Sequence, residues 1–409
     1  MAVADRDVLI IGAGHAGAMV AVGLRQKGFT GSILMVGEEP ALPYERPPLS
    51  KAYFVGALEE QRLYLRKAEF WQERDVEVRV STIVARLRHE DHEAELTDGT
   101  VVRYRHCVIA TGGRVRKLSC PGADLAGVHY LRTLADVDAI RGDLKDGARM
   151  VVIGGGYVGL EMAASARKLG YDVTLIEALD RVLARVTSPI ISRFYEAQHR
   201  AHGVDVRLGT GVTAIEGGDH VTGVRLATGE VVPADLVVVG IGILPNTELA
   251  HESGLACDNG VVVDELCRTT DPDVFAIGDV ARHPNRYAAD AMRLESVQNA
   301  VDQAKTVVGV IMGQPEPYKD LPWFWSDQYD LKLQTAGLAI GYDETIVRGD
   351  ATTAPFSVVY LRDGQIIAID AVNAIKDFMG AKGLIQAGVK PDKARLADPA
   401  VPMKELTGA

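Results

Sequence analysis

The N-terminal part of the chain alternates short apolar runs with a helical pattern. Val8–Ile11 is an apolar run of the length of a buried parallel strand, and Gly12-x-Gly14-x-x-Gly17 follows it directly. Apolar residues then recur at helical spacing, and a second apolar run, Ile33–Val36, leads to the acid Glu38. The order of strand, glycine turn, helix, strand and acid predicts a dinucleotide-binding unit.

Each position in this unit has a physical reason. Gly12 allows a tight turn, Gly14 lets backbone N–H groups approach a pyrophosphate, and Gly17 lets the helix pack closely on the strand. The helix N-terminus favours negative charge. Glu38 can accept hydrogen bonds from an adenosine ribose. A lone glycine pattern is weak evidence, and here it is the surrounding order of elements that makes the prediction specific.

The same unit recurs from Met150. Gly154-x-Gly156-x-x-Gly159 lies between an apolar run and a helical pattern, and the run Val173–Ile176 ends in Glu177. Two such units predict two dinucleotides. Glu177 would bond both ribose hydroxyls and repel a 2′-phosphate, which favours NADH over NADPH, although Arg181 and Arg185 lie near enough to weaken that preference.

The remaining pattern predicts further strands and helices. A strand Cys107–Ala110 closes in Thr111-Gly112-Gly113, and a strand beginning at Val274 ends in Gly278-Asp279, which places a carboxylate at a favoured ligand position. Other expected elements are a helix over Leu63–Asp75, a strand over Val76–Val84, a hairpin around Thr97–Thr100, strands over Val204–Leu208, Gly223–Leu226 and Ala234–Gly240, and a helix from Arg293 to about Met312.

The chain changes character at Leu321. Trp323-Phe324-Trp325 holds two of the three tryptophans. Strand patterns over Leu331–Thr335, Ser357–Leu361 and Gln365–Val372 precede a helical pattern over Ala374–Ala387. We expect a separate small α+β domain there, and we expect Pro245 to mark a crossover between the two earlier domains.

Bulk properties narrow the class of protein. A length of 409 residues implies two or three domains. Hydrophobic residues make up 47% of the chain, and no apolar run approaches the roughly 20 residues of a membrane span. A net charge of −11 argues against nucleic acid as the main partner. None of the four cysteines forms a CxxC pair, so we expect neither a zinc site nor a disulfide framework, and the absence of a signal-peptide pattern favours the cytoplasm.

A proline-rich segment, Pro40–Gly56, follows the first unit. Its prolines exclude a strand, and it carries Arg46 and Lys51. These charges are either solvated or contact a cofactor, and the position of the segment beside a nucleotide motif favours the second interpretation. The part from Pro43 to Lys51 contains no cysteine, which excludes a dithiol relay in that segment.

These features together resemble a known family. The two glycine motifs, Thr111-Gly112-Gly113 and Gly278-Asp279 are similar to the two-dinucleotide-domain flavoproteins. The strings at 44–51 (YERPPLSK), 154–161 (GGGYVGLE), 181–189 (RVLARVTSP) and 323–334 (WFWSDQYDLKLQ) resemble the FAD-dependent ferredoxin reductases of bacterial oxygenase systems. The resemblance covers nearly the whole chain, except for the last 20 or so residues.

The resemblance implies an α/β fold with two Rossmann-like domains and a small C-terminal α+β domain. An FAD-binding domain would comprise 1–113 and 245–321, an NADH-binding domain 114–244, and the C-terminal domain 322–409. The residues that would contact FAD are Gly12, Gly14, Ala16, Gly17, Glu38, Arg46, Lys51, Val84, Thr111, Gly112, Arg132, Asp279, Val297 and Trp325. Those that would form the NADH site are Gly154, Gly156, Tyr157, Gly159, Glu161, Glu177 and Gly242.

The resemblance also implies the reaction. Lys51 would lie near flavin N5, and Glu161 would pair with it and face the nicotinamide. Hydride would pass from NADH to FAD, and single electrons would then pass to an acidic 2Fe–2S ferredoxin that serves a cytochrome monooxygenase or a ring-hydroxylating dioxygenase. Because both proteins would be acidic, docking would need a local basic patch, for which Arg66, Lys67 and Lys305 are candidates.

Other functions suit the same motifs. An NADH oxidase or peroxide-reducing flavoprotein would pass electrons to oxygen or peroxide, and the missing cysteine disfavours it. Rubredoxin or a nitrite reductase would be an alternative partner. A flavoprotein that senses NADH without turnover would use the same two sites. The sequence leaves the oligomeric state open between a monomer and a weak dimer.

Overall fold

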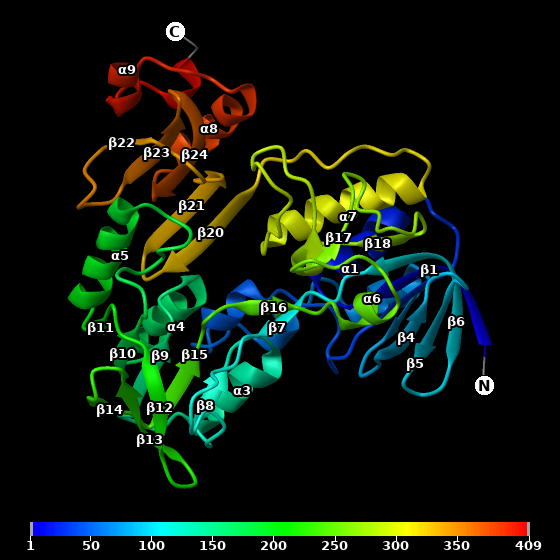
Figure 1. The fold of residues 1–409 in the computed structure, drawn as a ribbon, viewed down its shortest axis with the longest axis horizontal. Helices are drawn as coiled ribbons and strands as arrows, with labels where there is room; N and C mark the ends of the chain where they lie inside the picture. Colours follow the sequence, from blue (N-terminus) through cyan, green and yellow to red (C-terminus); the bar gives the residue numbers. More distant parts are fainter. Residues whose placement is uncertain (1–2, 407–409) are drawn as a thin grey trace. The chain divides into compact units, whose positions relative to one another are not determined.

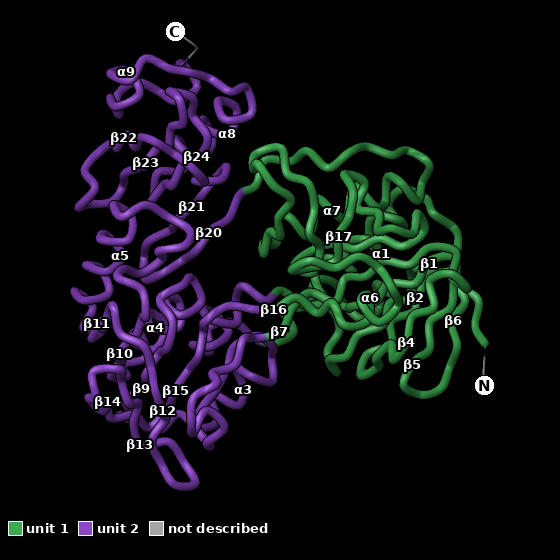
Figure 2. Tube along the Cα trace, in the orientation of Figure 1, with its two compact units in different colours: residues 1–45, 60–114, 244–322 green, residues 46–59, 115–243, 323–409 purple. Residues whose placement is uncertain are grey.

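The structure, a computed structural model, describes residues 3–406 and divides the chain into two compact units. Unit 1 comprises 1–45, 60–114 and 244–322, and unit 2 comprises 46–59, 115–243 and 323–409, which Figure 2 shows in different colours. Short strands β7 (Gly113–Val115) and β16 (Ile243–Pro245) pair where the chain passes between units. The three-domain division stays a prediction. The α/β fold class is confirmed.

Unit 1 is built on one mixed sheet (Figure 1). Its strand order is β3-β2-β1-β6-β5-β4, and β18 pairs with β6. The strands are β1 (Val3–Ile11), β2 (Ile33–Val36), β3 (Val76–Arg79), β4 (Val84–Arg88), β5 (Glu93–Leu96), β6 (Val101–Ile109) and β18 (Val274–Ala276). Helices α1 (His15–Gln26) and α7 (Val297–Ile311) pack together over one face, and α6 (Glu248–Glu252) lies against β4.

Strand β1 is apolar along its second half because both its faces are buried. Val8 and Ile10 pack among residues of α1 and α7, whereas Leu9 and Ile11 pack among residues of β4, β5 and β6. Parallel strands buried on both sides carry such continuous apolar runs. Strand β1 therefore forms the centre of unit 1, and the glycine turn leaves from its carboxyl end.

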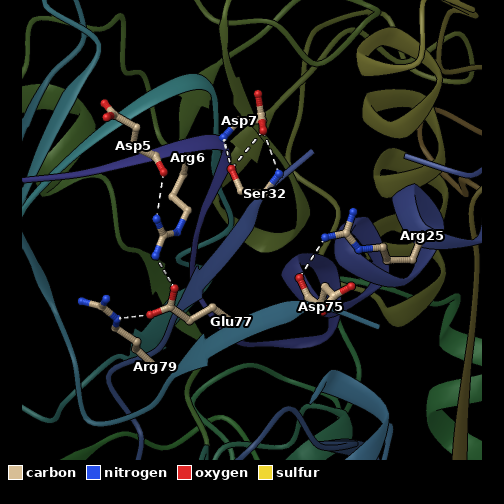
Figure 3. Close-up of polar contacts among 8 residues, drawn as sticks. All are labelled: Asp5, Arg6, Asp7, Arg25, Ser32, Asp75, Glu77 and Arg79. Carbon is tan, nitrogen blue, oxygen red and sulfur yellow. Dashed lines mark hydrogen bonds and ion pairs between the residues drawn. The ribbon is translucent and has the colours of Figure 1, made fainter. Parts of the chain in front are cut away.

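Polar side chains tie neighbouring strands and loops of unit 1 together away from that turn (Figure 3). The Asp7 carboxylate accepts hydrogen bonds from the backbone N–H and the hydroxyl of Ser32, at 2.7 and 2.9 Å. Glu77 lies between Arg6 and Arg79 and bonds both. Arg25 on α1 donates to the backbone carbonyl of Asp75. These contacts join α1, β1 and β3 to one another and to the turns before β2 and β3.

Unit 2 contains a parallel sheet of order β11-β10-β9-β15-β8. Its strands are β8 (Val128–Tyr130), β9 (Arg149–Ile153), β10 (Asp172–Ile176), β11 (Asp205–Arg207) and β15 (Leu236–Val239), and its helices are α3 (Leu134–Asp143), α4 (Tyr157–Lys168) and α5 (Pro189–Ala201). An antiparallel sheet of β12 (Val212–Gly217), β13 (Val221–Leu226) and β14 (Val231–Pro233) shares its apolar core.

The C-terminal part of unit 2 is an antiparallel sheet of order β20-β21-β24-β23-β22. Its strands are β20 (Trp323–Gln328), β21 (Leu331–Gly337), β22 (Glu344–Arg348), β23 (Phe356–Arg362) and β24 (Gln365–Val372). Helix α8 (Ile375–Ala387) packs on β24 and β21, and α9 (Lys393–Ala397) follows. None of the helices within 3–406 is long and apolar enough to cross a membrane.

The remaining elements are short. They are the 3₁₀ turns η1 (Pro47–Ser50), η2 (Glu60–Arg62), η3 (Gly278–Val280) and η4 (Met403–Glu405), the helix α2 (Ala68–Glu73), and the paired strands β17 (Val261–Val262) and β19 (Ala281–Arg282).

Several sequence predictions of elements were wrong in extent. The strand expected over Val76–Val84 is two strands, because Ser81 has a φ of +49° and Thr82 donates to the Gly37 carbonyl. The helix expected over Leu63–Asp75 is only α2. The helix expected from Arg293 begins at Val297, because the Ser296 hydroxyl accepts from the Asn299 N–H and caps it there.

Candidate functional site

The first glycine turn connects β1 to α1 and needs glycine at two of its positions for packing. Gly12 has a φ of +117°, and a Cβ there would lie 2.2 Å from the Ala110 carbonyl oxygen. A Cβ on Gly17 would lie 2.1 Å from the carbonyl oxygen of Gly12. At Gly14 a Cβ would meet nothing within 4 Å. Gly14 is therefore not required by packing, and the open space beside it fits a pyrophosphate.

An unsatisfied polar atom supports the same interpretation. His15 is the first residue of α1, and its ring atom Nδ1 is buried with no hydrogen-bond partner in the described chain. Burial lowers the pKa of His15, so the neutral ring is favoured. Ala16 is buried beside it. An anionic ligand at the helix N-terminus would meet the free N–H groups of this turn.

The carboxyl ends of three neighbouring strands meet near this turn. Thr111, just past β6, donates from its hydroxyl to the Asn246 carbonyl at 2.8 Å, and the Asn246 amide donates back to the Thr111 carbonyl. Gly112 has a φ of +62°. Gly278, just past β18, donates from its N–H to Gln303 on α7 at 2.7 Å. These bonds fix the edge of the sheet where ligands bind in such folds.

Four other expected FAD contacts lie on elements of the same sheet or beside it. Asp279 follows Gly278 in η3, and Arg293 donates to the Asp279 carbonyl at 2.7 Å, a contact that the sequence analysis did not find. Val297 opens α7, where backbone N–H groups lack an acceptor within the helix. Glu38 is exposed just past β2, and Val84 is the first residue of β4.

The second glycine turn repeats the construction of the first. A Cβ on Gly154 would lie 2.4 Å from the Gly240 carbonyl oxygen, and one on Gly159 would lie 1.9 Å from the Gly154 carbonyl oxygen. Gly156, like Gly14, would meet nothing within 4 Å. The turn connects β9 to α4. Unit 2 therefore holds its own open cradle for a dinucleotide, and Gly242 lies in the loop after β15 with a φ of +103°.

Glu177 is held firmly at the end of β10. One of its carboxylate oxygens accepts the N–H of Gly155 at 2.6 Å, and the other accepts the N–H of Leu179 at 2.8 Å. Each oxygen keeps a lone pair for a ribose hydroxyl. The Arg181 guanidinium bonds the carbonyls of Thr187 and Ala184 in its own loop and the hydroxyl of Ser192 in the first turn of α5.

Lys51 and Glu161 form a buried ion pair in unit 2. Lys51 Nζ lies 2.9 Å from Glu161 Oε2, and the Glu161 side chain is 5% exposed. The Ser50 hydroxyl donates to the same oxygen, and the Ser326 hydroxyl donates to Oε1 at 2.7 Å. Ser165, one turn further along α4, donates to the Ser50 carbonyl. The pairing of Lys51 with Glu161 was expected from the sequence, whereas the contacts of the three serines were not.

Two residues of β20 contact two residues of α4. Tyr157 and Glu161 lie one turn apart on the helix, and Phe324 and Ser326 lie two residues apart on the strand, so each pair shares a face. The Tyr157 and Phe324 rings lie 4.6 Å apart, and Ser326 bonds Glu161. Trp325 points to the other face of the strand, with its ring 5.6 Å from that of Trp323.

The other two expected cofactor residues also meet within unit 2. The Arg46 guanidinium donates to the Arg132 carbonyl at 2.7 Å, which joins the start of η1 to the segment before α3. Thr133 caps α3 in a reciprocal capping box with Asp136. The position of Arg132 is therefore set on one side by this cap and on the other by Arg46.

A second polar cluster in unit 2 was not expected. Asp370 on β24 accepts a hydrogen bond from the Tyr360 hydroxyl, which itself accepts the Ser188 N–H at 2.9 Å. Burial raises the pKa of Asp370 to about 7. The side-chain amide of Gln328 donates to the Ser326 hydroxyl, and its oxygen Oε1 lies 2.9 Å from Nε2 of the buried His199. An isolated acid inside an apolar strand pattern was the available sequence signal.

Two open glycine cradles, each followed by a strand ending in an acid, define a class of protein that binds two dinucleotides. Residues 6–304 match the pyridine nucleotide-disulphide oxidoreductase family, and residues 323–407 match the reductase C-terminal family. The chain belongs to the pyridine nucleotide-disulphide oxidoreductase family. The expected cofactors, FAD and a nicotinamide dinucleotide, are those of this family and fit both cradles.

Named relatives match over almost the full chain. A 5,5'-dehydrodivanillate O-demethylase ferredoxin reductase subunit of Sphingobium sp. is 51% identical, covering 98% of each chain. A ferredoxin–NAD(P)(+) reductase of Sphingomonas sp. is 49% identical over 98% of this chain and 97% of its own. A crystal structure of the covalent putidaredoxin reductase–putidaredoxin complex matches with a TM-score of 0.95, 42% identity and 98% coverage of both chains. The resemblance to ferredoxin reductases is confirmed.

Proposed function

We propose that this protein is an NADH-dependent ferredoxin reductase that supplies single electrons to a 2Fe–2S ferredoxin of a cytochrome monooxygenase or ring-hydroxylating dioxygenase system. The observation that carries the proposal is the buried Lys51–Glu161 pair beside the second glycine turn. The names of the relatives and the complex of putidaredoxin reductase with its redox partner support the choice of acceptor.

The chain's own residues bind, orient and stabilise charge. FAD, when bound, would supply the conversion between two-electron and one-electron transfer. The Gly14 turn would hold its pyrophosphate, and the Gly156 turn would hold that of NADH. Lys51 would place a positive charge where negative charge develops, and Glu161 would fix Lys51 and orient the nicotinamide carboxamide. Ser50 and Ser326 act as positioning residues because they hold Glu161.

Cysteine chemistry has no place in this route. All four cysteines are free, and the segment carrying Lys51 contains none. Cys107 and Cys267 are fully buried, and burial raises the pKa of both thiols, so neither forms the reactive thiolate readily. Electrons would therefore leave for an external acceptor without passing through a dithiol.

The preference for NADH rests on Glu177. Its fixed carboxylate suits two ribose hydroxyls and would repel a 2′-phosphate. The expected weakening by Arg181 loses support because that guanidinium already bonds three acceptors in its own loop and in α5. Arg185 is exposed and stays a candidate for weakening the preference.

The acidity of the ferredoxin, its docking patch and a monomeric or weakly dimeric state are further parts of the proposal. Lys67 is exposed at the start of α2, and the Arg66 guanidinium lies 5.5 Å from the Phe70 ring centroid. Lys305 Nζ lies 2.5 Å from Asp302 Oδ1, so the two side chains together carry no net charge. We therefore place the basic docking patch at Arg66 and Lys67 rather than at Lys305.

The test is stopped-flow reduction of the purified yellow protein by NADH and by NADPH, followed by mixing with a 2Fe–2S ferredoxin. We expect fast flavin bleaching by NADH, slow bleaching by NADPH, and electron passage to the iron–sulfur protein. The variant Glu177→Gln should reduce the difference between the rates of flavin bleaching by NADH and by NADPH, without changing the FAD content.

Three outcomes would contradict the proposal. Bleaching followed by oxygen consumption, with no transfer to any ferredoxin, would indicate an oxidase. A stable charge-transfer complex with slow turnover would indicate a sensor. No bleaching by either nucleotide would remove the catalytic assignment.

A further inference from the structure

Two polar segments of unit 1 meet at the amino end of β18. The turn between β4 and β5 carries His89 and His92, and the loop before β18 carries Asp271 and Asp273. One ligand atom from each of His92, Asp271 and Asp273 lies within 4.8 Å of the other two. Imidazole nitrogen and carboxylate oxygen form a donor set that zinc and related divalent ions prefer.

Two further histidines lie beside the carboxylates of this cluster. His89 Nδ1 is hydrogen-bonded to Asp271 Oδ2 at 2.9 Å, whereas His106 Nδ1 lies 3.1 Å from Asp273 Oδ1 without forming a hydrogen bond. A hydrogen-bonded carboxylate such as that of Asp271 is typical of metal ligands supported by an outer shell. Within 3–406, neither Asp271 nor Asp273 is paired with a lysine or arginine, so no cationic side chain balances their two charges.

A buried hydroxyl points to a missing ligand at the same place. The Tyr104 ring stacks on the His92 ring, with centroids 5.4 Å apart and planes at 14°. Tyr104 is 4% exposed, its hydroxyl has no partner in the described chain, and that hydroxyl is close enough to feel the charges of Asp271 and Asp273. A hydroxyl in that position can bond a metal-bound water.

The backbone around the cluster is fixed. The Asp273 N–H donates to Asp271 Oδ1 at 2.9 Å, and the Asp273 carbonyl accepts the Cys107 N–H at 2.9 Å, which ties the loop to β6. The His92 carbonyl accepts the Tyr104 N–H at 2.9 Å. Two loops distant in sequence are thus anchored to the same strand. Tetrahedral zinc bonds of about 2.0–2.1 Å imply a ligand spacing of about 3.4 Å, so the three ligand atoms, which lie within 4.8 Å of one another, would move closer when an ion binds.

We propose that His92, Asp271 and Asp273 form a binding site for a divalent transition ion, with zinc as the reference ion and water as the fourth ligand. His89 holds the Asp271 carboxylate, His106 lies beside that of Asp273, and the Tyr104 hydroxyl bonds the water. The ion would neutralise the carboxylates and join the β4–β5 turn to the β18 loop. Its role is structural.

The site is separate from the proposed cofactor edge. Asp273 precedes β18, whereas Gly278 and Asp279 follow it. At about 3.3 Å per residue, the strand places the two ends roughly 10 Å or more apart. Metal binding should therefore leave flavin reduction unchanged, which keeps its test independent of the reductase assignment.

The test is zinc binding to the tag-free, FAD-loaded protein in buffer without phosphate or chelator. Equilibrium dialysis with elemental analysis should give one zinc per chain, and zinc should raise the thermal unfolding midpoint. His92→Asn and Asp273→Asn should weaken binding at least tenfold. Asparagine suits position 92 because His92 has a φ of +52°, which Asn adopts readily.

The matched control is His129→Asn. His129 pairs with Asp143 at 2.7 Å, but this pair has no third ligand in the described chain. This variant should bind zinc like the wild type. The proposal is overturned if the wild type fails to bind one zinc, or if His92→Asn and Asp273→Asn bind it as tightly as His129→Asn does.

Discussion

The carboxylate of Glu161 depends on groups that come from two other segments of the chain. Ser50 and Lys51 lie in the proline-rich segment, whereas Ser326 lies on β20 in the C-terminal part. A buried charge needs several hydrogen bonds to offset the loss of water. The geometry of the pair is therefore set by the packing of α4, η1 and β20 together.

We expect Ser326→Ala to slow flavin reduction by NADH about tenfold, which corresponds to about 1.4 kcal/mol in the barrier. The physical reason is that Glu161 loses one fixed donor and Lys51 becomes less well oriented. FAD content should stay unchanged. Single-turnover stopped-flow measurement gives the rate directly.

The control for this variant is Ser357→Ala in the same sheet. Ser357 is buried and donates to the Asp377 carboxylate at 2.7 Å, so its removal also costs one hydrogen bond to a carboxylate. It should reduce stability by a comparable amount, roughly 1.5–3 kcal/mol, without slowing flavin reduction. Equal rate losses in both variants would show that Ser326 acts only through stability.

Asp370 should make stability depend on pH. Its folded pKa of about 7 exceeds the ordinary value of 3.8, so the native state holds its proton where the unfolded chain has lost it. This contribution is full below the unfolded pKa and is lost as pH rises towards 7. Asp370→Asn removes this pH dependence because asparagine does not ionise. The free energy of unfolding of the variant, relative to that of the wild type, should therefore rise by about 3 kcal/mol from pH 5 to pH 8.

The measurement is the unfolding free energy of both proteins across that pH range. Asp330→Asn changes an exposed aspartate near the same sheet. The unfolding free energy of this control variant should change with pH as that of the wild type does. A constant difference between Asp370→Asn and the wild type would show that Asp370 is ionised in both states.

At the scale of single residues, the sequence predicted the members of short motifs better than the residues that form hydrogen bonds with them. Gly14, Gly156 and Glu177 belong to a local pattern with a mechanical reason for each position. Ser326 bonds a residue that lies 165 positions away. A serine carries no local pattern that identifies its partner, so only packing reveals it.

The two glycine turns are the elements most sharply defined by their geometry. Each has two glycines whose Cβ would collide with backbone and one, Gly14 or Gly156, whose Cβ would enter open space. The colliding positions serve packing between strand and helix. The open positions serve the ligand.

Substitutions should separate these two roles. Gly14→Ala should fold but lose FAD affinity at least tenfold, and Gly156→Ala should retain FAD but raise the NADH concentration needed for half-maximal reduction about tenfold. Gly17→Ala should fail to fold well because its Cβ would lie 2.1 Å from the Gly12 carbonyl oxygen. Flavin content, NADH titration and circular dichroism measure the three effects. Normal FAD and NADH binding in the two open-position variants would contradict the assignment.

Element prediction was best where one local rule decided the structure. Strands β2 and β24 were predicted with the bounds observed, since apolar runs and turns mark them clearly. The start of α7 was missed by four residues because a serine cap outweighed the apolar pattern before it. Strand β20 was not predicted as a strand, because apolar and polar residues do not alternate along Trp323–Gln328.

At the scale of the whole molecule, each unit has its own core and its own glycine turn. We expect heat to unfold them in separable steps. NAD⁺ at a hundred times its dissociation constant should stabilise the unit 2 step by about 2.7 kcal/mol. Calorimetry with flavin fluorescence tests this. A single transition, shifted by NAD⁺ together with FAD release, would contradict it.

The pairing of β18 with β6 has a consequence for the protein while it is being made. Val274 pairs with Cys107, so this edge of β6 stays unpaired until a strand that is synthesised much later becomes available. At about 5–20 residues per second, the ribosome takes on the order of ten to thirty seconds to reach it. The segment 115–243 emerges in that interval and has time to fold first. Unit 1 is then completed only when the chain has been synthesised to residue 322 of 409, and the β6 edge stays exposed to other nascent chains until β18 is available.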